Sequence, residues 1–189
     1  YVSATADLAE KQLKSIKDIL TSDIYRYYWP EMIQENENKR ERWAVDEIAV
    51  DHPKRKQEGV RDATVKACGL TANMTGLHCN IAVMDDVVVP SNAYTETGRE
   101  LVRATYSQLS SIQTTGAKEW VVGTRYHPKD LYCDLMEMTE TFFDAEKDED
   151  VELHVYEVFE REVETNGEFL WPKQRRKDGK TFGFDDREL

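Results

Sequence analysis

The sequence predicts an α/β domain built on a mainly parallel β-sheet with helices on its faces. Short apolar runs, of which residues 81–84 are the clearest, are typical of buried strands in parallel sheets. Segments with apolar residues at helical spacing alternate with these runs along the chain, and this is the order of elements in βαβ units.

The composition is that of a globular chain with an acidic surface. The 189 residues carry 25 Lys and Arg against 37 Asp and Glu, a formal net charge of −12. This balance argues against a whole surface devoted to nucleic acid, although it allows a local basic strip. No apolar run is long enough to suggest a membrane span. Three cysteines without Cys-x-x-Cys spacing argue against a disulfide framework or a zinc site and favour a reducing compartment.

The first part of the chain predicts a strand followed by a helix. Residues 1–4 have the composition of a strand end, and Asp7 is the expected N-cap of the helix. The expected buried stripe of this helix consists of apolar residues at helical spacing, namely Ala9, Leu13, Ile16 and Leu20. The aromatic cluster at residues 25–29 is expected to be a packed helix end, stopped by Pro30.

The next part is more polar. Residues 34–42 are expected to be exposed, and the apolar runs 43–45 and 48–50 predict one strand with a bulge. The turn that follows holds the consecutive basic residues 54–56, which form either a solvated loop or a contact for a phosphate backbone. Residues 63–68 predict a further strand.

The central strand ends in two adjacent carboxylates, Asp85 and Asp86. Ligands of open α/β sheets gather beyond the carboxyl ends of the strands, and successive strand residues point to opposite faces. The two carboxylates are therefore expected to have different roles. One would hold a Mg²⁺ that bridges nucleotide phosphates, and the other would polarise an attacking water. An Asp-Asp pair alone also fits a solvated strand end.

Helices and strands continue to alternate after this pair. A helix is expected to begin near Thr95 or Thr97 and to end at Gly116, with a buried stripe of Leu101, Thr105, Leu109 and Ile112. Residues 119–123 predict a strand and residues 130–138 a helix, on which Asp130 and Asp134 are expected at the surface. A later strand is expected at residues 151–155.

A phosphate-binding loop is not found in the sequence. The Gly-Lys-Thr at residues 179–181 has Gln174 where the first glycine of the motif should stand. No long apolar run leads into it and no helix start follows it, so a turn is expected there.

Three segments together carry a resemblance, residues 75–89, residues 92–99 and residues 121–132. The most specific is Gly123-Thr-Arg-Tyr-His-Pro-Lys-Asp-Leu-Tyr132. They resemble the ATPase domain of the large terminase subunits of tailed phages. The resemblance implies a P-loop NTPase-like (ASCE type) core over residues 1–172, incomplete at its N-terminus. It also implies that residues 173–189 are a basic, turn-rich segment leading toward a nuclease domain.

The resemblance also implies roles for four residues. Asp85 matches the Walker B carboxylate that holds Mg²⁺ through water, and Asp86, also at the metal, matches the catalytic position that activates water. Thr124, after Gly123, matches the coupling motif that senses the γ-phosphate of ATP. Arg125 would reach phosphate or a neighbouring subunit.

The chain departs from the family pattern in two places. Leu77-His78 stands where many relatives have an arginine that acts on the adjacent subunit. The Walker A loop is expected upstream of Tyr1, so the chain by itself is expected to be an inactive part of an ATPase.

The family implies the partners and the location of the protein. The partners are double-stranded DNA, the portal protein, the small terminase subunit and further copies of the chain in a ring. The location is the host cytoplasm, with docking on the procapsid. Two other functions stay open: a metal-dependent nuclease that uses Asp85 and Asp86 as two-metal ligands, and a non-catalytic module with an ATPase-like fold.

Overall fold

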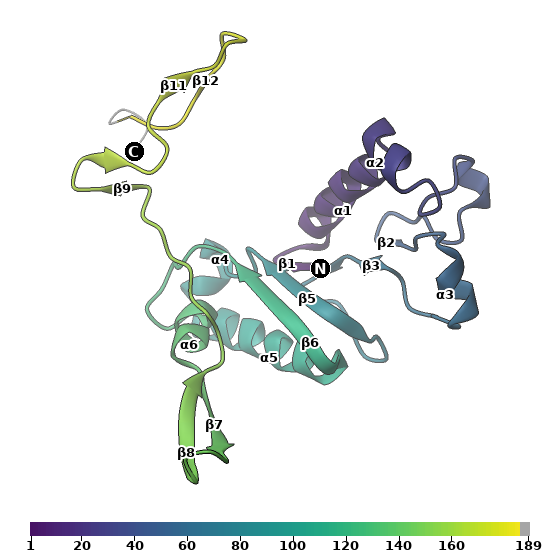
Figure 1. The fold of residues 1–189 in the computed structure, drawn as a ribbon. Coiled ribbons are helices and arrows are strands. Elements are labelled where there is room, and N and C mark those ends of the chain that lie inside the picture. The colour runs from purple at the N-terminus through teal and green to yellow at the C-terminus, as the bar shows by residue number, and fades with distance from the viewer. Residues whose placement is uncertain (186–189) are drawn as a thin grey trace. The chain divides into compact units, whose positions relative to one another are not determined.

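The computed structural model describes residues 1–185 (Figure 1). The chain forms two compact units, Tyr1–Leu135 and the residues from Met136 onward. The first unit is built on a four-stranded sheet in the order β4-β1-β5-β6, and all three pairings are parallel. Its strands are β1 (Val2–Ser3), β4 (Cys68–Gly69), β5 (Cys79–Asp85) and β6 (Gln113–Val122). The predicted α/β class with a parallel sheet is confirmed.

Helices and one small antiparallel pair complete the first unit. The helices are α1 (Ala6–Leu20), α2 (Asp23–Tyr28), the 3₁₀ helix η1 (Glu37–Lys39), α3 (Pro53–Gln57), α4 (Pro90–Ala93), α5 (Glu96–Ile112) and α6 (Leu131–Glu137). The antiparallel pair is β2 (Glu47–Ile48) with β3 (Val65–Lys66). None of the helices among residues 1–185 is long and apolar enough to cross a membrane.

The two long helices lie on opposite sides of the sheet (Figure 1). Helix α1 packs on β1 and β4 through a core cluster of Ala9, Leu13, Ile48 and Ala67, with Tyr1 against it. Helix α5 presents Val102, Thr105, Leu109 and Ile112 as its buried residues. The Thr105 hydroxyl donates to Leu70 O at 2.9 Å and fixes α5 to the loop after β4.

Helix α1 confirms the predicted stripe and corrects the predicted cap. Ala9 and Leu13 are buried, and Ile16 and Leu20 pack against the same cluster. The N-cap is Thr5 rather than Asp7, because the Thr5 hydroxyl accepts from Leu8 N at 3.3 Å. Asp7 instead lies in the first turn, where a negative charge is favoured by the helix dipole.

The predicted bulged strand over residues 43–50 is wrong. Ala44 N donates to Glu47 O at 2.9 Å, and Trp43 forms an antiparallel bridge with Ile48, so the segment turns back on itself. Four residues between the bridge partners are enough for a tight turn, and the alternating apolar residues therefore belong to its two arms.

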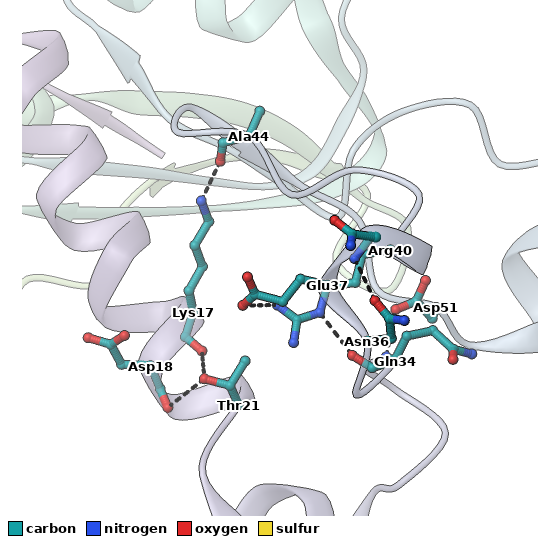
Figure 2. A network of polar contacts seen from close by, with 10 residues as sticks. Lys17, Asp18, Thr21, Gln34, Asn36, Glu37, Arg40, Ala44 and Asp51 are labelled. Carbon is teal, nitrogen blue, oxygen red and sulfur yellow. Dashed lines mark hydrogen bonds and ion pairs between the residues drawn. The ribbon is translucent and has the colours of Figure 1, made fainter.

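Arg40 is buried within the stretch that was expected to be exposed. Its guanidinium donates to Gln34 O at 2.9 Å and pairs with Glu37 at 3.0 Å (Figure 2).

The Arg40 guanidinium also lies 4.4 Å from the centre of the Trp43 ring, and Lys17 lies over the same ring at 5.6 Å. Lys17 also donates to Ala44 O, and burial lowers its pKa. The Trp43 ring therefore has two cations within reach of its π-system, which the polar sequence around it does not indicate.

The aromatic cluster after α1 is not packed into the core, contrary to expectation. Tyr27 is 80% exposed and Tyr28 is 64% exposed. The rings contact one another instead, with Tyr25 and Trp29 5.0 Å apart at their centroids.

Helix α5 and strand β6 differ from their predicted bounds. Thr95 caps the helix by accepting from Gly98 N at 3.1 Å, and Val102 takes the buried place expected for Leu101, which is 45% exposed. The helix ends at Ile112 and β6 begins at the next residue. Gly116, the predicted helix end, lies within the strand at a φ of +77°.

The second unit consists of antiparallel two-stranded pairs. They are β7 (Thr139–Asp144) with β8 (Glu149–His154), β9 (Glu164–Thr165) with β10 (Glu168–Phe169), and β11 (Gln174–Arg175) with β12 (Thr181–Phe182). No residue of this unit within the described chain is buried. The strand predicted at 151–155 is confirmed as β8, whereas β7 was not predicted. The β11–β12 connection contains Gly179 at a φ of +84°, so Gly179 and Lys180 lie in the predicted turn, whereas Thr181 is already the first residue of β12.

The division after Leu135 was not evident from the sequence. The assignment of residues 1–172 to one functional core, with a distinct segment after it, stays a prediction. The boundary between the two compact units, after Leu135, falls inside the predicted range of residues 1–172.

We expect Leu13→Ala to lower the free energy of unfolding by about 2–5 kcal/mol, because it leaves a cavity in the α1 cluster. Leu8→Ala is the matched control on the same helix, since Leu8 is 40% exposed, and should cost less than about 1 kcal/mol. Denaturant unfolding of both variants checks this. Equal losses would contradict the assignment of the core.

Candidate functional site

The two central carboxylates lie where β5 ends. Asp85 is the last residue of the strand, in register with Ser3 of β1 and with Val122 of β6. Asp86 has a φ of +47°, a left-handed conformation that Asp adopts more readily than most residues. Its backbone N–H donates to Val122 O at 3.0 Å. The chain therefore turns sharply at Asp86 while it stays attached to the end of β6.

Asp85 and Asp86 have different environments. Asp85 is half-buried, and its Oδ2 accepts a hydrogen bond from the Tyr1 hydroxyl. Burial, together with this hydrogen bond, raises the pKa of the Tyr1 phenol, so the phenol remains a donor to Asp85. Asp86 is exposed, and its side chain has no hydrogen bond or ion pair with any of residues 1–185. One carboxylate is oriented by the fold and the other faces solvent.

The predicted coupling residues follow the adjacent strand. Gly123, Thr124 and Arg125 come directly after β6 and are exposed. Because β5 and β6 are parallel and hydrogen-bonded up to Asp85 and Val122, both segments leave the sheet at the same edge. The structure thus brings the four predicted site residues to neighbouring strand ends. Their functional roles stay predictions.

Tyr132 connects these two segments, although no pattern in the sequence marked it as a separate site residue. Its hydroxyl accepts from Val88 N at 3.3 Å and donates to Val122 O at 3.4 Å. Burial, with the nearby Asp86 charge as a smaller cause, raises the pKa of Tyr132 to about 12. The phenol lies so close to Gly123 that a Cβ there would be 2.0 Å from the hydroxyl oxygen.

Asp130 is fully buried, which corrects its expected place on the surface. Its carboxylate accepts from Tyr126 N at 2.9 Å, His127 N at 3.0 Å and Cys133 N at 3.3 Å. Charge-assisted hydrogen bonds of this kind are strong, and here they fix the turn after Arg125 to the first turn of α6. Asp130 therefore caps α6.

Arg125 and Asp134 also have neighbours in this region. Burial and the Asp130 charge raise the pKa of the Cys133 thiol, and Arg125 lies close enough to oppose this shift. Asp134 pairs with Arg103 of α5 at 2.6 Å and is held by this ion pair.

The second resembling segment, residues 92–99, stabilises the chain after Asp86. The Asn92 side chain accepts from Val89 N and donates to Val87 O, both at 2.9 Å. A Cβ at Gly98 would lie 2.4 Å from Asn92 O, so glycine allows α5 to begin directly against α4. These residues form a structural support behind the carboxylates.

Asp85 and Asp86 have the donor chemistry that Mg²⁺ prefers, but two carboxylates leave its other positions to water or phosphate. Mg²⁺ usually takes one or two carboxylates, several waters and substrate phosphates. Within residues 1–185, no three His, Cys, Asp or Glu side chains form a group that could hold a metal by themselves. A two-metal nuclease site would need further carboxylates, and Asp130 and Asp134 are engaged by backbone amides and by Arg103.

Comparison with known proteins gives no assignment. No protein-family model matches the chain, and no curated protein matches it. The function is therefore inferred from the residues and from the geometry at the ends of β5 and β6.

We expect Gly123→Ala to destabilise the first unit by about 1–3 kcal/mol, because the new methyl group overlaps the Tyr132 ring. In a Tyr132→Leu background the same change should cost less than about 0.5 kcal/mol, since the phenol is gone. Denaturant unfolding of the two single variants and the double variant measures this coupling. Additive losses would show that Tyr132 does not occupy the space at Gly123.

Proposed function

We propose that this chain is part of an ATP-hydrolysing motor that moves double-stranded viral DNA into a procapsid, namely the ATPase part of a large terminase subunit. The observation that supports it best is the meeting of two segments at one sheet edge. Asp85-Asp86 leaves β5 and Gly123-Thr124-Arg125 leaves β6, and Asp86 N–H joins them through Val122 O at 3.0 Å. A nucleotide hydrolase needs a carboxylate that holds Mg²⁺ and a residue that orients the attacking water, close to one another.

The environments of the carboxylates support a division of roles. Asp85, oriented by the Tyr1 hydroxyl, is the ligand that holds Mg²⁺ through water. Asp86, exposed and without a protein partner among residues 1–185, orients the attacking water. Magnesium bound with ATP supplies neutralisation of the phosphate charge. Thr124 contributes a hydroxyl that senses the γ-phosphate, and Arg125 contributes a positive charge near the phosphates.

The proposal requires a phosphate-binding loop from outside residues 1–185, in an ASCE-type P-loop fold. Strand β6 has a neighbour on one side only among the described strands. On the face shared by β5 and β6, Ile81, Trp120 and Val122 are between 55% and 62% exposed. An open strand edge beside an uncovered apolar face provides a place for the strand and helix that flank such a loop.

The setting follows from the same proposal. The motor works as a ring of identical subunits in the host cytoplasm, with the portal protein, the small terminase subunit and DNA as partners. A non-catalytic module with an ATPase-like fold is the second candidate, because residues 1–185 contain no phosphate loop and turnover by this chain alone is expected to be negligible.

We expect Asp86→Asn, in the full-length motor, to lower ATP turnover at least about a hundredfold while ATP still binds. Asn tolerates the left-handed backbone as Asp does, so the change removes the charge and keeps the turn. Asp85→Asn is expected to weaken Mg²⁺-dependent binding as well. Steady-state turnover and nucleotide titration measure both. Near-normal turnover of Asp86→Asn would refute the proposed role.

We expect Thr124→Ala, in the same motor, to bind ATP nearly normally and to move little DNA, because the hydroxyl is proposed to sense the γ-phosphate. Thr97→Ala is the matched control, since Thr97 is exposed on the first turn of α5. Packaging rate, ATP affinity and melting temperature should be measured on both variants. If Thr124→Ala packages normally, the coupling role is wrong.

A further inference from the structure

A basic cavity is lined by residues of α3 and of the segments on either side of it. Helix α3 lies away from strand β5, which carries Asp85 at its end (Figure 1). The cavity has a volume of about 400 Å³. Arg42, Arg55, Lys56 and Arg61 line it, and Glu41 is the only acidic residue in its wall. Four cations against one carboxylate give the cavity a formal charge of +3, within a chain of net charge −12.

The charges of this cavity are only weakly neutralised by the protein. Neither Lys56 nor Arg61 makes a side-chain hydrogen bond or ion pair with any of the residues that the structure describes. Arg42 approaches Glu47 at 3.8 Å, and Glu47 is shared with Lys66 at 3.4 Å. The cations that line the cavity repel one another, so binding of an anion among them would be favoured.

The wall of the cavity is held in place by Arg55. Its guanidinium donates to Asp62 O at 2.9 Å and to the Thr64 hydroxyl at 3.4 Å, and its backbone carbonyl accepts from Val60 N at 3.0 Å. Gly59 makes the tight turn between them at a φ of +65°. The Arg55 Nε is buried without a hydrogen-bond partner among residues 1–185, so its positive charge is incompletely satisfied. The loop that carries Arg61 is therefore anchored to the helix that carries Lys56.

We propose that this cavity binds phosphate groups, and that its ligand is the backbone of a nucleic acid. Arginine forks match phosphate oxygens in bidentate geometry, and a lysine adds a point charge. The residues lining the cavity include no aromatic ring on which a base would stack, and Val60 is their one apolar side chain. The contact therefore reads charge rather than sequence. The inference does not rest on the proposed ATPase function.

The test uses the 189-residue chain without ATP, so its result is independent of the motor proposal. Binding of a fluorescent DNA duplex of arbitrary sequence is followed by anisotropy over a salt series. The variant Lys56→Ala/Arg61→Ala should lose at least about tenfold in affinity at low salt. Its slope of log affinity against log salt should be smaller by about 2, because two phosphate contacts are lost. Lys11→Ala/Lys14→Ala, with the same change of charge on exposed positions of α1, should behave like the wild type.

Each outcome decides the proposal. Equal losses in both double variants, with folding shown unchanged by circular dichroism, would overturn it, because the attraction would then be general. Binding of neither the duplex nor pyrophosphate by the wild type would overturn it too. Pyrophosphate binding that needs Lys56 and Arg61, without duplex binding, would support phosphate recognition and assign the ligand to a small phosphate ester.

Discussion

The parallel pairing of β5 with β6 is the constraint on which the candidate site depends. The seven-residue β5 and the ten-residue β6 begin as partners, Cys79 with Gln113. After a register shift between Cys79 and Ile81, their pairing brings Asp85 and Val122 to the same level. The hydrogen bond from Asp86 N to Val122 O then continues the pairing one residue past the strand. Tyr132 adds a second connection from α6. Two loops that are far apart in sequence thereby become one surface.

The Tyr1 side chain connects the hydrophobic core under α1 with this surface. The Tyr1 ring packs against the cluster under α1, and its hydroxyl reaches the Asp85 carboxylate. Packing of the ring therefore restricts the orientation of a polar group at the strand end. A tight core around Leu13 also serves to preorganise a carboxylate, since a loosely packed ring would donate its hydrogen bond in several directions.

Regular packing could be predicted from the sequence, and side-chain contacts to the backbone could not. Helical spacing of apolar residues identified α1 and α5, and a short apolar run identified β5, because these elements bury apolar residues in a regular pattern. Strand β6 was predicted too short, since its first residues are polar and are paired through their backbone. Asp130 was assigned to the surface because the sequence does not distinguish a buried aspartate that accepts from three backbone amides from a solvated aspartate. Tyr132 likewise contacts Val88 and Val122, which are far from it in the sequence, and residue spacing does not predict such contacts.

The left-handed backbone at Asp86 imposes a compromise between reach and conformation. Nucleotide hydrolases commonly have the longer glutamate at the position that this residue is proposed to fill. A short side chain that can bond locally is better suited to a φ of +47°, whereas glutamate gains no such compensation. The aspartate carboxylate is one methylene nearer to the main chain, so a water that it orients must lie closer to the end of β5. The backbone conformation at Asp86, rather than the basicity of its carboxylate, would then determine how close to the end of β5 the phosphate must bind.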